Sequence, residues 1–313
     1  MTGLETKQRG RRAHLAVVKD DEPTVMRSVG NDYPMNVIAC FGPAGSPGKS
    51  TLAANIATEL ALTGERVLLI DLDTLAPSLA LVLGLVDTPA GLSACLRLSE
   101  QARLTKDEYE RLTVSIQLGR QELRFMPGLS SPQRWPEVTP ERLETLLANI
   151  RDYVDHVVLD LPQVTAFRPQ MVHPSQGSNG SEINRDSLLT SVLTKADKLV
   201  VISGADPVAA QRFLLAQEYL AELKPRGEQF VVVNRFRTSA LGLSAKAELE
   251  DTYIALANRR VDVYVPEDRE NLDRAMLNGL PLALLKRSSP ARQAIADLTK
   301  QILVSSKLFK ERG

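Results

Sequence analysis

The segment Gly48-Lys49-Ser50-Thr51 constrains this chain more than any other feature. It lies a few residues after the apolar run Asn36–Phe41, from which a short Gly/Pro loop separates it. The apolar run predicts a buried strand, and Ser50 and Thr51 stand where a helix would begin. A strand, a glycine loop and a helix N-terminus in this order bind phosphate, because backbone N–H groups and the helix dipole point at the anion. Lys49 would reach the β- and γ-phosphate oxygens and the Ser50 hydroxyl would ligate Mg²⁺, so the segment predicts a nucleoside triphosphate site.

The loop departs from the usual spacing, in which a glycine precedes Gly-Lys-Ser/Thr by four residues. Pro43 stands where that glycine is expected, and Gly42 comes one residue too early. Pro43 and Pro47 have no backbone N–H and cannot donate to a phosphate. The residues that remain to bind the cofactor are Gly45, Ser46, Gly48, Lys49, Ser50 and Thr51.

Two other interpretations of the loop stay open at this point. A turn between a strand and a helix could contain Gly-Lys-Ser without binding phosphate. Gly42, Gly45 and Gly48 also form a weak Gly-x-x-Gly-x-x-Gly pattern, which would suit a dinucleotide fold. However, no Tyr is followed four residues later by Lys, the pair typical of short-chain dehydrogenases. The order of strand, loop and helix therefore favours the phosphate loop.

Composition and charge restrict the classes of protein to which the chain can belong. The chain has 313 residues, of which 43% are hydrophobic, so it can form one large α/β domain or two small ones. Lys and Arg number 38, as do Asp and Glu, so no net charge favours nucleic acid or a membrane. Cys40 and Cys95 fit no metal or disulfide pattern, and no apolar run reaches the ~18 residues of a membrane span. We expect a cytoplasmic protein, with peripheral contact to the inner face of the membrane as an open alternative.

The chain divides into a polar, unpatterned stretch and a long patterned one. Residues 1–34 predict a flexible N-terminal tail, and residues 35–313 predict the phosphate-binding domain. In the second part, Val-, Ile- and Leu-rich runs alternate with helical patterns, which is typical of a doubly wound, mostly parallel α/β sheet with helices on both faces. The strand-like runs are Val37–Phe41, Arg66–Asp71, Leu123–Met126, His156–Leu161, Lys198–Ser203, Gln229–Asn234 and Val261–Val265. Helices are expected after the loop, with Gly64 as the C-cap, and over Pro140–Tyr153 and Pro207–Leu223.

One segment interrupts this alternation. Residues 165–185 contain Pro-Ser-Gln-Gly-Ser-Asn-Gly-Ser and have no core pattern. They follow the strand that ends near Leu161, where the chain would leave the phosphates. We expect either a segment that orders with the γ-phosphate or a surface insertion without a role.

Carboxylates end two of the predicted strands. Asp71 and Asp73 follow one apolar run, and Asp160 ends another. Beside a phosphate loop, such carboxylates hold Mg²⁺ through its waters or orient the attacking water. We expect Asp160 to hold the metal together with Ser50, and Asp73 to act in catalysis together with Lys49. The alternative for each is a strand-end Asp that caps the next turn or helix.

These motifs together resemble the ParA/MinD superfamily of P-loop ATPases, including the CpaE/TadZ proteins of Flp/Tad pilus assembly. The resemblance covers roughly Met35 to Leu303 and rests on Gly48–Thr51, the two acidic strand ends, Val231-Val232-Val233-Asn234-Arg235 and Val265-Pro266-Glu267-Asp268 with Ala275-Met276-Leu277-Asn278-Gly279-Leu280-Pro281. It implies that ATP and Mg²⁺ are the cofactors. Asn234 would read the adenine edge, with Pro266 beside it.

The resemblance also implies an ATPase that dimerises with ATP between two copies. The family loop usually carries a second lysine where this chain has Ala44, so we expect ATP binding with slow or partner-stimulated hydrolysis. An ATP-binding scaffold without turnover is the alternative. An iron–sulfur carrier is disfavoured because the chain has no Cys-x-x-Cys, and a tyrosine kinase because the tail has no tyrosine cluster.

The partner is expected to be a protein of a pilus, division or partition system, positioned or assembled with the help of ATP. Membrane contact could come from Ile302–Lys310, which is apolar and basic but short. We favour a terminal helix that packs on the domain. Non-specific DNA contact could come from a basic patch, but we favour a solvated surface for its residues, which are Arg259, Arg260, Lys286, Arg287 and Arg292.

Overall fold

The computed structural model describes residues 35–43, 45, 48–85, 87–163, 185–237 and 245–310, all of which belong to residues 34–313. The expected tail over 1–34 lies outside the described residues. So does the 165–185 segment, except for Arg185, which begins a helix. Ala44, Ser46 and Pro47 of the loop also lie outside them.

The strands of the described residues form a mostly parallel sheet, as the sequence predicts. Their spatial order is β3-β4-β2-β5-β1-β6-β7-β8, and only the β3–β4 pair is antiparallel. The bounds are β1 Asn36–Phe41, β2 Val67–Asp71, β3 Val114–Leu118, β4 Gln121–Met126, β5 His156–Asp160, β6 Lys198–Gly204, β7 Glu228–Phe236 and β8 Val263–Pro266. β1 precedes the phosphate loop, and β2 is the next strand along the chain. In the sheet β5 lies between them, and the chain continues on the other side of β1 with β6, so the sheet is doubly wound.

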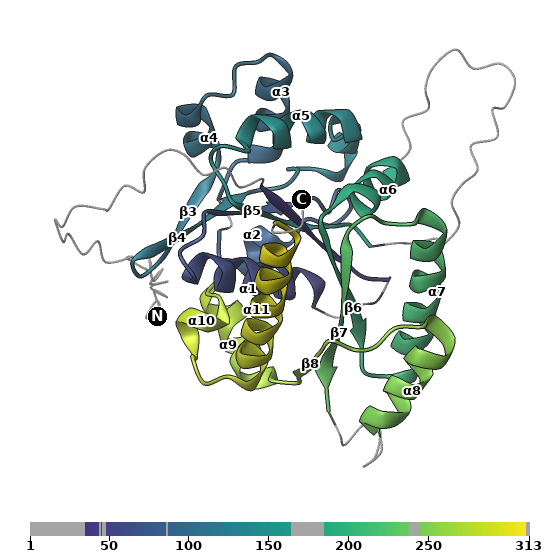
Figure 1. Ribbon diagram of the computed structural model, residues 1–313. Helices are drawn as coiled ribbons and strands as arrows, with labels where there is room; N and C mark the ends of the chain where they lie inside the picture. The colour runs from purple at the N-terminus through teal and green to yellow at the C-terminus, as the bar shows by residue number, and fades with distance from the viewer. Residues whose placement is uncertain are drawn as a thin grey trace, which may run out of the picture. The chain divides into compact units, whose positions relative to one another are not determined.

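Helices cover both faces of this sheet (Figure 1). One face packs against α1 Lys49–Leu62, α2 Leu79–Val82, α9 Arg269–Asn278, α10 Leu282–Leu285 and α11 Pro290–Lys310. The other packs against α3 Gly91–Glu100, α4 Lys106–Leu112, α5 Pro140–Ile150, α6 Arg185–Lys195, α7 Pro207–Leu223 and α8 Ala245–Ala257. A short 3₁₀ helix, η1, spans Pro132–Glu137.

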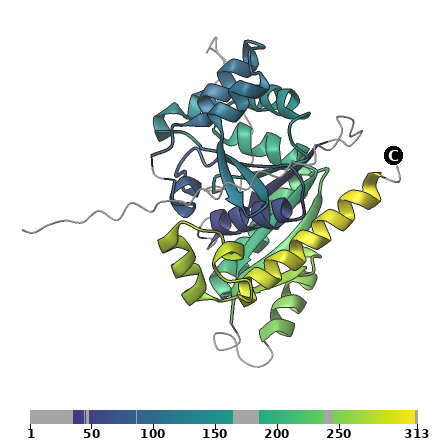
Figure 2. The ribbon, with the colours of Figure 1, turned by 90° about the vertical axis from the view of Figure 1, so that its left-hand side faces the viewer.

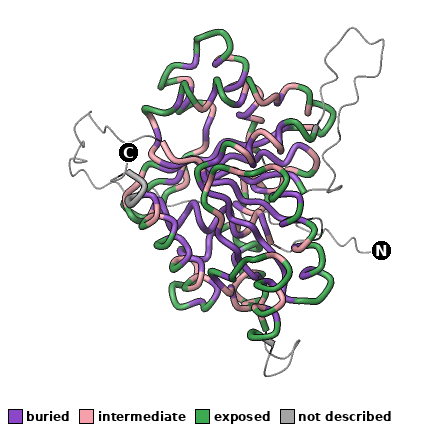
Figure 3. The backbone as a smooth tube through the Cα atoms, turned by 45° about the vertical axis from the view of Figure 1, so that its right-hand side comes forward, coloured by how far each residue is buried: buried purple, intermediate pink, exposed green. Residues whose placement is uncertain are grey.

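The central strands are apolar at consecutive positions because both of their faces are buried (Figure 3). In β1, Ile38 and Cys40 join the core beneath α1, while Ala39 and Phe41 join the core beneath the other helices. All four side chains are fully buried. Two separate hydrophobic layers therefore lie on the two sides of one sheet, which explains the lack of alternation in the sequence.

The edge strand β3 is the element that the sequence interpretation missed. Its side chains alternate between half-buried and exposed until Leu118, and it pairs with β4 through a hairpin whose Gly119 has φ +77°. A strand with one open edge carries too few buried residues to produce an apolar run. The expected helix Pro207–Leu223 is confirmed, whereas the helix from Pro140 ends at Ile150 rather than Tyr153. Gly64, with φ +92°, follows the C-cap residue Thr63 instead of being the C-cap itself.

The C-terminal helix α11 packs on α1, as expected for a terminal helix that completes the domain (Figure 2). Its residues Ile295, Leu298 and Ile302 are buried in the same core as α1. Val304 is exposed on its outer side. None of the described helices is long and apolar enough to cross a membrane.

Candidate functional site

The carboxyl ends of three neighbouring strands bring the predicted site together. β1 lies beside β5, and β5 lies beside β2, so that Cys40 pairs in register with Asp160 and Asp160 with Asp71. Parallel strands end at the same edge of the sheet, where α/β proteins bind their ligands. The loop after β1 and both acidic strand ends therefore meet, although about 90 residues of chain separate Asp71 from Asp160.

Lys49 begins α1 and points into this edge. Its Nζ lies 3.3 Å from Asp160 Oδ1 and 3.6 Å from Asp73 Oδ2. Lys49 is 6% exposed and Asp160 is fully buried. The two expected catalytic residues and the expected metal-binding carboxylate thus form one buried charged cluster.

This cluster has unused bonding capacity. Among the described residues, Lys49 Nζ and both carboxylate oxygens of Asp160 are buried without a hydrogen bond, and only the ion pairs join them. Buried charges in this state are expensive unless a ligand or ion completes their bonds. An ammonium and a free carboxylate fit a phosphate and a magnesium ion, respectively.

Burial determines the ionisation of the acidic residues here. Burial raises the pKa of Asp160, and the negative charge of Asp73 adds to this, while the Lys49 ammonium opposes it. Burial also raises the pKa of Asp71 to about 7, helped by the charge of Asp160. A cation bound beside these carboxylates would favour their charged forms.

Asp71 and Asp73 have different surroundings. Asp71 accepts hydrogen bonds from the backbone N–H groups of Asp73, Ser78 and Leu79, at 3.1, 3.0 and 3.0 Å, so it organises the turn and the start of α2. Asp73 uses Oδ1 to accept from the N–H groups of Leu75 and Ala76, both at 3.0 Å. Its Oδ2 remains directed at Lys49. The geometry therefore favours the turn-capping alternative for Asp71, and it leaves one Asp73 oxygen for the site.

The N-terminus of α1 has the backbone geometry and the charge of an anion-binding site. Gly48 precedes the helix with φ 82°, and the first helical turn contains no acidic residue. Ser50 is half-buried and accepts a hydrogen bond from the Ser78 hydroxyl at 3.0 Å. Gly45 also has a positive φ, +77°, which glycine adopts without strain. Ser46, which was expected to bind phosphate, lies outside the described residues.

The described part of the chain shows no metal site made of protein side chains alone. The described residues contain no group of three or more His, Cys, Asp or Glu side chains arranged to hold an ion. Magnesium needs no such group, because it retains waters and is usually held by one or two protein ligands together with substrate phosphates. Ser50 and Asp160 fit that pattern.

Asn234 is distant from the phosphate loop in the sequence but packs against it in the structure. A Cβ added to Gly48 would lie 2.6 Å from Asn234 Nδ2, so the amide packs directly on the glycine. The β7–β8 register shifts between Val233 and Phe236, and Arg235 has φ 54°, which is unusual for a residue with a side chain. This irregularity at the strand end leaves Asn234 buried beside the loop.

A small, mostly apolar cavity of about 90 Å³ opens beside Asn234. Its walls come from α1, β7, β8 and the segment from α9 to α10, and they include Thr51, Asn234, Val265 and Met276. Pro266, which follows Val265, pairs with Phe236 at the end of β8. A flat apolar ring with polar edges would suit such walls.

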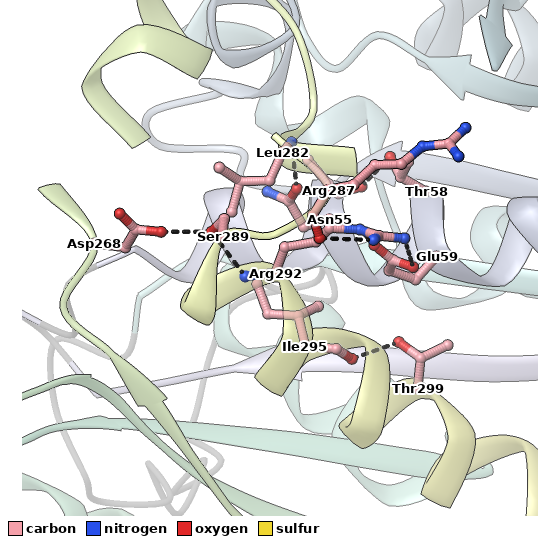
Figure 4. A network of polar contacts seen from close by, with 11 residues as sticks. Asn55, Thr58, Glu59, Asp268, Leu282, Arg287, Ser289, Arg292, Ile295 and Thr299 are labelled. Atoms are coloured by element: carbon pink, nitrogen blue, oxygen red, sulfur yellow. Dashed lines mark hydrogen bonds and ion pairs between the residues drawn. The ribbon is translucent and has the colours of Figure 1, made fainter. Parts of the chain in front are cut away.

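A polar network behind the site ties the C-terminal elements to α1 (Figure 4). Asn55 Oδ1 accepts from the N–H of Leu282 at 2.9 Å, and Arg292 holds Glu59 with two contacts of 2.7 and 3.1 Å. Ser289 accepts from the N–H of Arg292 and so caps α11. The sequence interpretation placed Arg292 in a candidate basic patch, whereas the structure pairs it with Glu59, and it assigned no role to Asn55, Glu59 or Ser289. The signal for Asn55 and Glu59 is that they are polar residues one turn apart in a helix that is largely apolar from Leu52 onward.

Comparison with known proteins agrees with this geometry. Residues 38–282 match the CobQ/CobB/MinD/ParA nucleotide binding domain. An uncharacterized ATP-binding protein of Methanocaldococcus jannaschii is 26% identical over 268 residues, which cover 85% of this chain and 87% of that protein.

Solved structures show the same fold at low identity. A ParA family ATPase from Chlorobium tepidum superposes with a TM-score of 0.67 at 19% identity, over 84% of this chain and 98% of that one. The septum site-determining protein MinD from Pyrococcus horikoshii, complexed with Mg-ADP, has a TM-score of 0.62 at 17% identity, over 86% and 96%. The chain therefore belongs to the CobQ/CobB/MinD/ParA family of nucleotide-binding domains.

Proposed function

We propose that this protein binds Mg·ATP, hydrolyses it slowly, and uses it in subcellular positioning or assembly. The observation that carries the proposal is the buried cluster in which Lys49 Nζ stands 3.3 Å from Asp160 and 3.6 Å from Asp73 at the start of α1. These are a phosphate-binding cation, a carboxylate for magnesium and a carboxylate for water, held at one sheet edge.

Each residue has a role in this proposal. Gly45, Gly48 and the first N–H groups of α1 bind phosphate oxygens, and Lys49 leaves its carboxylate partners to neutralise the same oxygens. Ser50 and Asp160 would hold magnesium, which supplies charge neutralisation on the phosphates when bound. Asp73 orients the attacking water with Oδ2, while its Oδ1 bonds to Leu75 and Ala76 keep the carboxylate in place.

We also propose a preference for ATP over GTP. The Asn234 side chain carries both a donor and an acceptor, and it lies between the loop and the apolar cavity. An adenine seated there would meet the amide at its edge and apolar walls, such as Val265, on its faces.

The cellular role is proposed at a coarser level. We favour a cytoplasmic, CpaE/TadZ-like protein that forms an ATP-linked homodimer and acts with a protein partner of a pilus, division or partition system. Residues 1–34 would form a tail and residues 35–313 the ATPase domain. Contact with the membrane or with DNA is a weaker proposal, because the buried side of α11 is already used in packing on α1.

A scaffold that binds ATP without turnover is the second candidate. It is favoured by the loop composition, since Lys49 is the only cation in residues 42–51 and Ala44 replaces the family's second lysine. Intact Asp73 and Asp160 favour turnover.

Titration calorimetry with Mg·ATP and Mg·GTP tests the proposal. We expect ATP to bind more tightly than GTP, and Lys49→Ala to remove most of the ATP affinity. Lys300→Ala is the matched control, because Lys300 is an exposed lysine of α11 that pairs with Asp297 on the same helix. Equal affinity for both nucleotides would contradict the adenine site. Unchanged ATP affinity in Lys49→Ala would contradict the phosphate site.

A further inference from the structure

Arg212 brings a second cation to the phosphate loop from a different element. It lies in the second turn of α7, whose neighbouring residues Ala209, Ala210 and Phe213 are buried against the sheet, while Arg212 itself is exposed. A Cβ added to Gly45 would lie 2.0 Å from Arg212 Nη1 and 3.2 Å from its Cζ. The guanidinium therefore lies directly against the backbone of the loop.

A helix cap and core packing hold α7 in place, so Arg212 approaches the loop from a well-anchored helix. Asp206 caps α7 by accepting from the N–H of Ala209 at 2.9 Å. Phe213, the residue after Arg212, stacks on Tyr253 with ring centroids 4.2 Å apart. The Tyr253 hydroxyl in turn bonds to Ser203 of β6 at 2.8 Å. The helix thus holds the base of the Arg212 side chain at a set distance from Gly45.

Among the described residues, no carboxylate forms an ion pair with the Arg212 guanidinium. Lys49 is paired with two carboxylates, whereas no ion pair or hydrogen bond neutralises Arg212 within the described parts of the chain. A nucleoside triphosphate brings about four negative charges. A magnesium ion and Lys49 together would balance about three of these charges, which leaves about one without a cationic partner in a loop with one lysine. A planar guanidinium binds phosphate oxygens in a bidentate manner, so it suits this task.

We propose that Arg212 is the second cation of the polyphosphate site, supplied by α7 of the same chain. It binds the phosphate oxygens of the nucleotide from the side of Gly45, opposite the helix that carries Lys49. This inference rests on the proposed ATP binding and adds a residue that the loop sequence does not contain. A Cβ at position 45 would displace the guanidinium, in addition to the strain that φ +77° imposes on any residue other than glycine.

The affinities of the parent and of its variants for Mg·ATP and for adenosine test the proposal. The parent is compared with Arg212→Gln, which removes the charge and keeps a planar, polar end group on a shorter side chain, with Arg212→Lys, and with Arg226→Ala as the control. Arg226 is an exposed arginine beyond the far end of α7. We expect Arg212→Gln to bind ATP about tenfold more weakly, the size of one charge-assisted hydrogen bond, and adenosine as well as the parent does. Arg212→Lys should bind ATP with an affinity between those of Arg212→Gln and the parent, and Arg226→Ala should bind ATP as tightly as the parent does.

An Arg212→Gln protein that binds ATP within twofold of the parent would overturn the inference. So would an equal loss for adenosine, because the effect would then not concern the phosphates. Lys49→Ala, measured in the same series, separates this failure from a failure of the proposed function. If Lys49→Ala loses ATP and Arg212→Gln does not, ATP binding stands and the role of Arg212 is wrong. If the parent itself binds no ATP, both are wrong.

Discussion

The pair formed by Glu59 and Arg292 offers a test of how the C-terminal helix is held. Glu59 of α1 is 7% exposed, and Arg292 of α11 binds both of its oxygens, at 2.7 and 3.1 Å. Truncating Arg292 to alanine would leave a buried carboxylate without a cation, and removing one partner of a buried pair typically destabilises a protein by about 3–5 kcal/mol. The Arg292 side chain is 22% exposed, so water can partly solvate the remaining charge. We therefore expect Arg292→Ala to lower the free energy of unfolding by about 2–3 kcal/mol.

Chemical denaturation, followed by circular dichroism, measures this change. Lys300→Ala, on the same helix, removes a pair whose side chains are 73% and 64% exposed, and it should change the free energy of unfolding by less than about 0.5 kcal/mol. The double substitution Glu59→Leu with Arg292→Met replaces both charges by apolar groups. It should recover most of the loss, because no unpaired charge remains buried.

Two outcomes would refute this reasoning. If Arg292→Ala is no more destabilising than Lys300→Ala, the contact contributes no more than a surface ion pair. If the double variant is as unstable as Arg292→Ala, the loss comes from packing rather than from the buried charge.

Three other expectations follow from the site and its supports. Asp73→Asn keeps an oxygen for the turn but loses the negative charge, so ATP turnover should fall about a hundredfold while ATP affinity, measured by calorimetry, changes little; an unchanged rate would rule out its role toward water. Gly279→Ala should destabilise the fold by about 1–3 kcal/mol in denaturant titration, because its φ is +62° and an added Cβ would lie 2.5 Å from the Cα of Gly84. Burial raises the pKa of Asp155, but the hydrogen bonds and charge of Arg66 outweigh this and hold that pKa below its usual value. The resulting stability is present above about pH 4 and is lost as the pH falls through the folded pKa, so the parent should lose more stability on acidification than Arg66→Ala, and equal losses would contradict the pairing.

Much of the site could be predicted because its signals are local. A phosphate loop needs a strand, a glycine turn and a helix N-terminus in immediate succession, and residues 36–51 contain all three. Asp73 and Asp160 follow apolar strands, and parallel strands end at a common edge whatever their order. Their proximity to Lys49 therefore followed from the fold class alone, and the structure confirms it.

Spatial neighbours that are distant in the chain could not be predicted in this way. Helical periodicity shows that Arg212 lies beside the buried side of α7, but it does not show which element faces Arg212. That Arg212 meets Gly45 depends on the strand order, which sets β6 next to β1 and so brings α7 to the loop. The bond from Leu282 to Asn55 likewise depends on how α10 packs on α1.

Residues adjacent in the chain carry the signals for the fold class, the candidate phosphate loop and the acidic strand ends, so these could be predicted. The turn that Asp71 organises, the edge position of β3 and the approach of Arg212 to the loop depend on contacts between distant segments. A local pattern indicates which side of an element is buried, whereas the packing of the whole core selects the partner on that side.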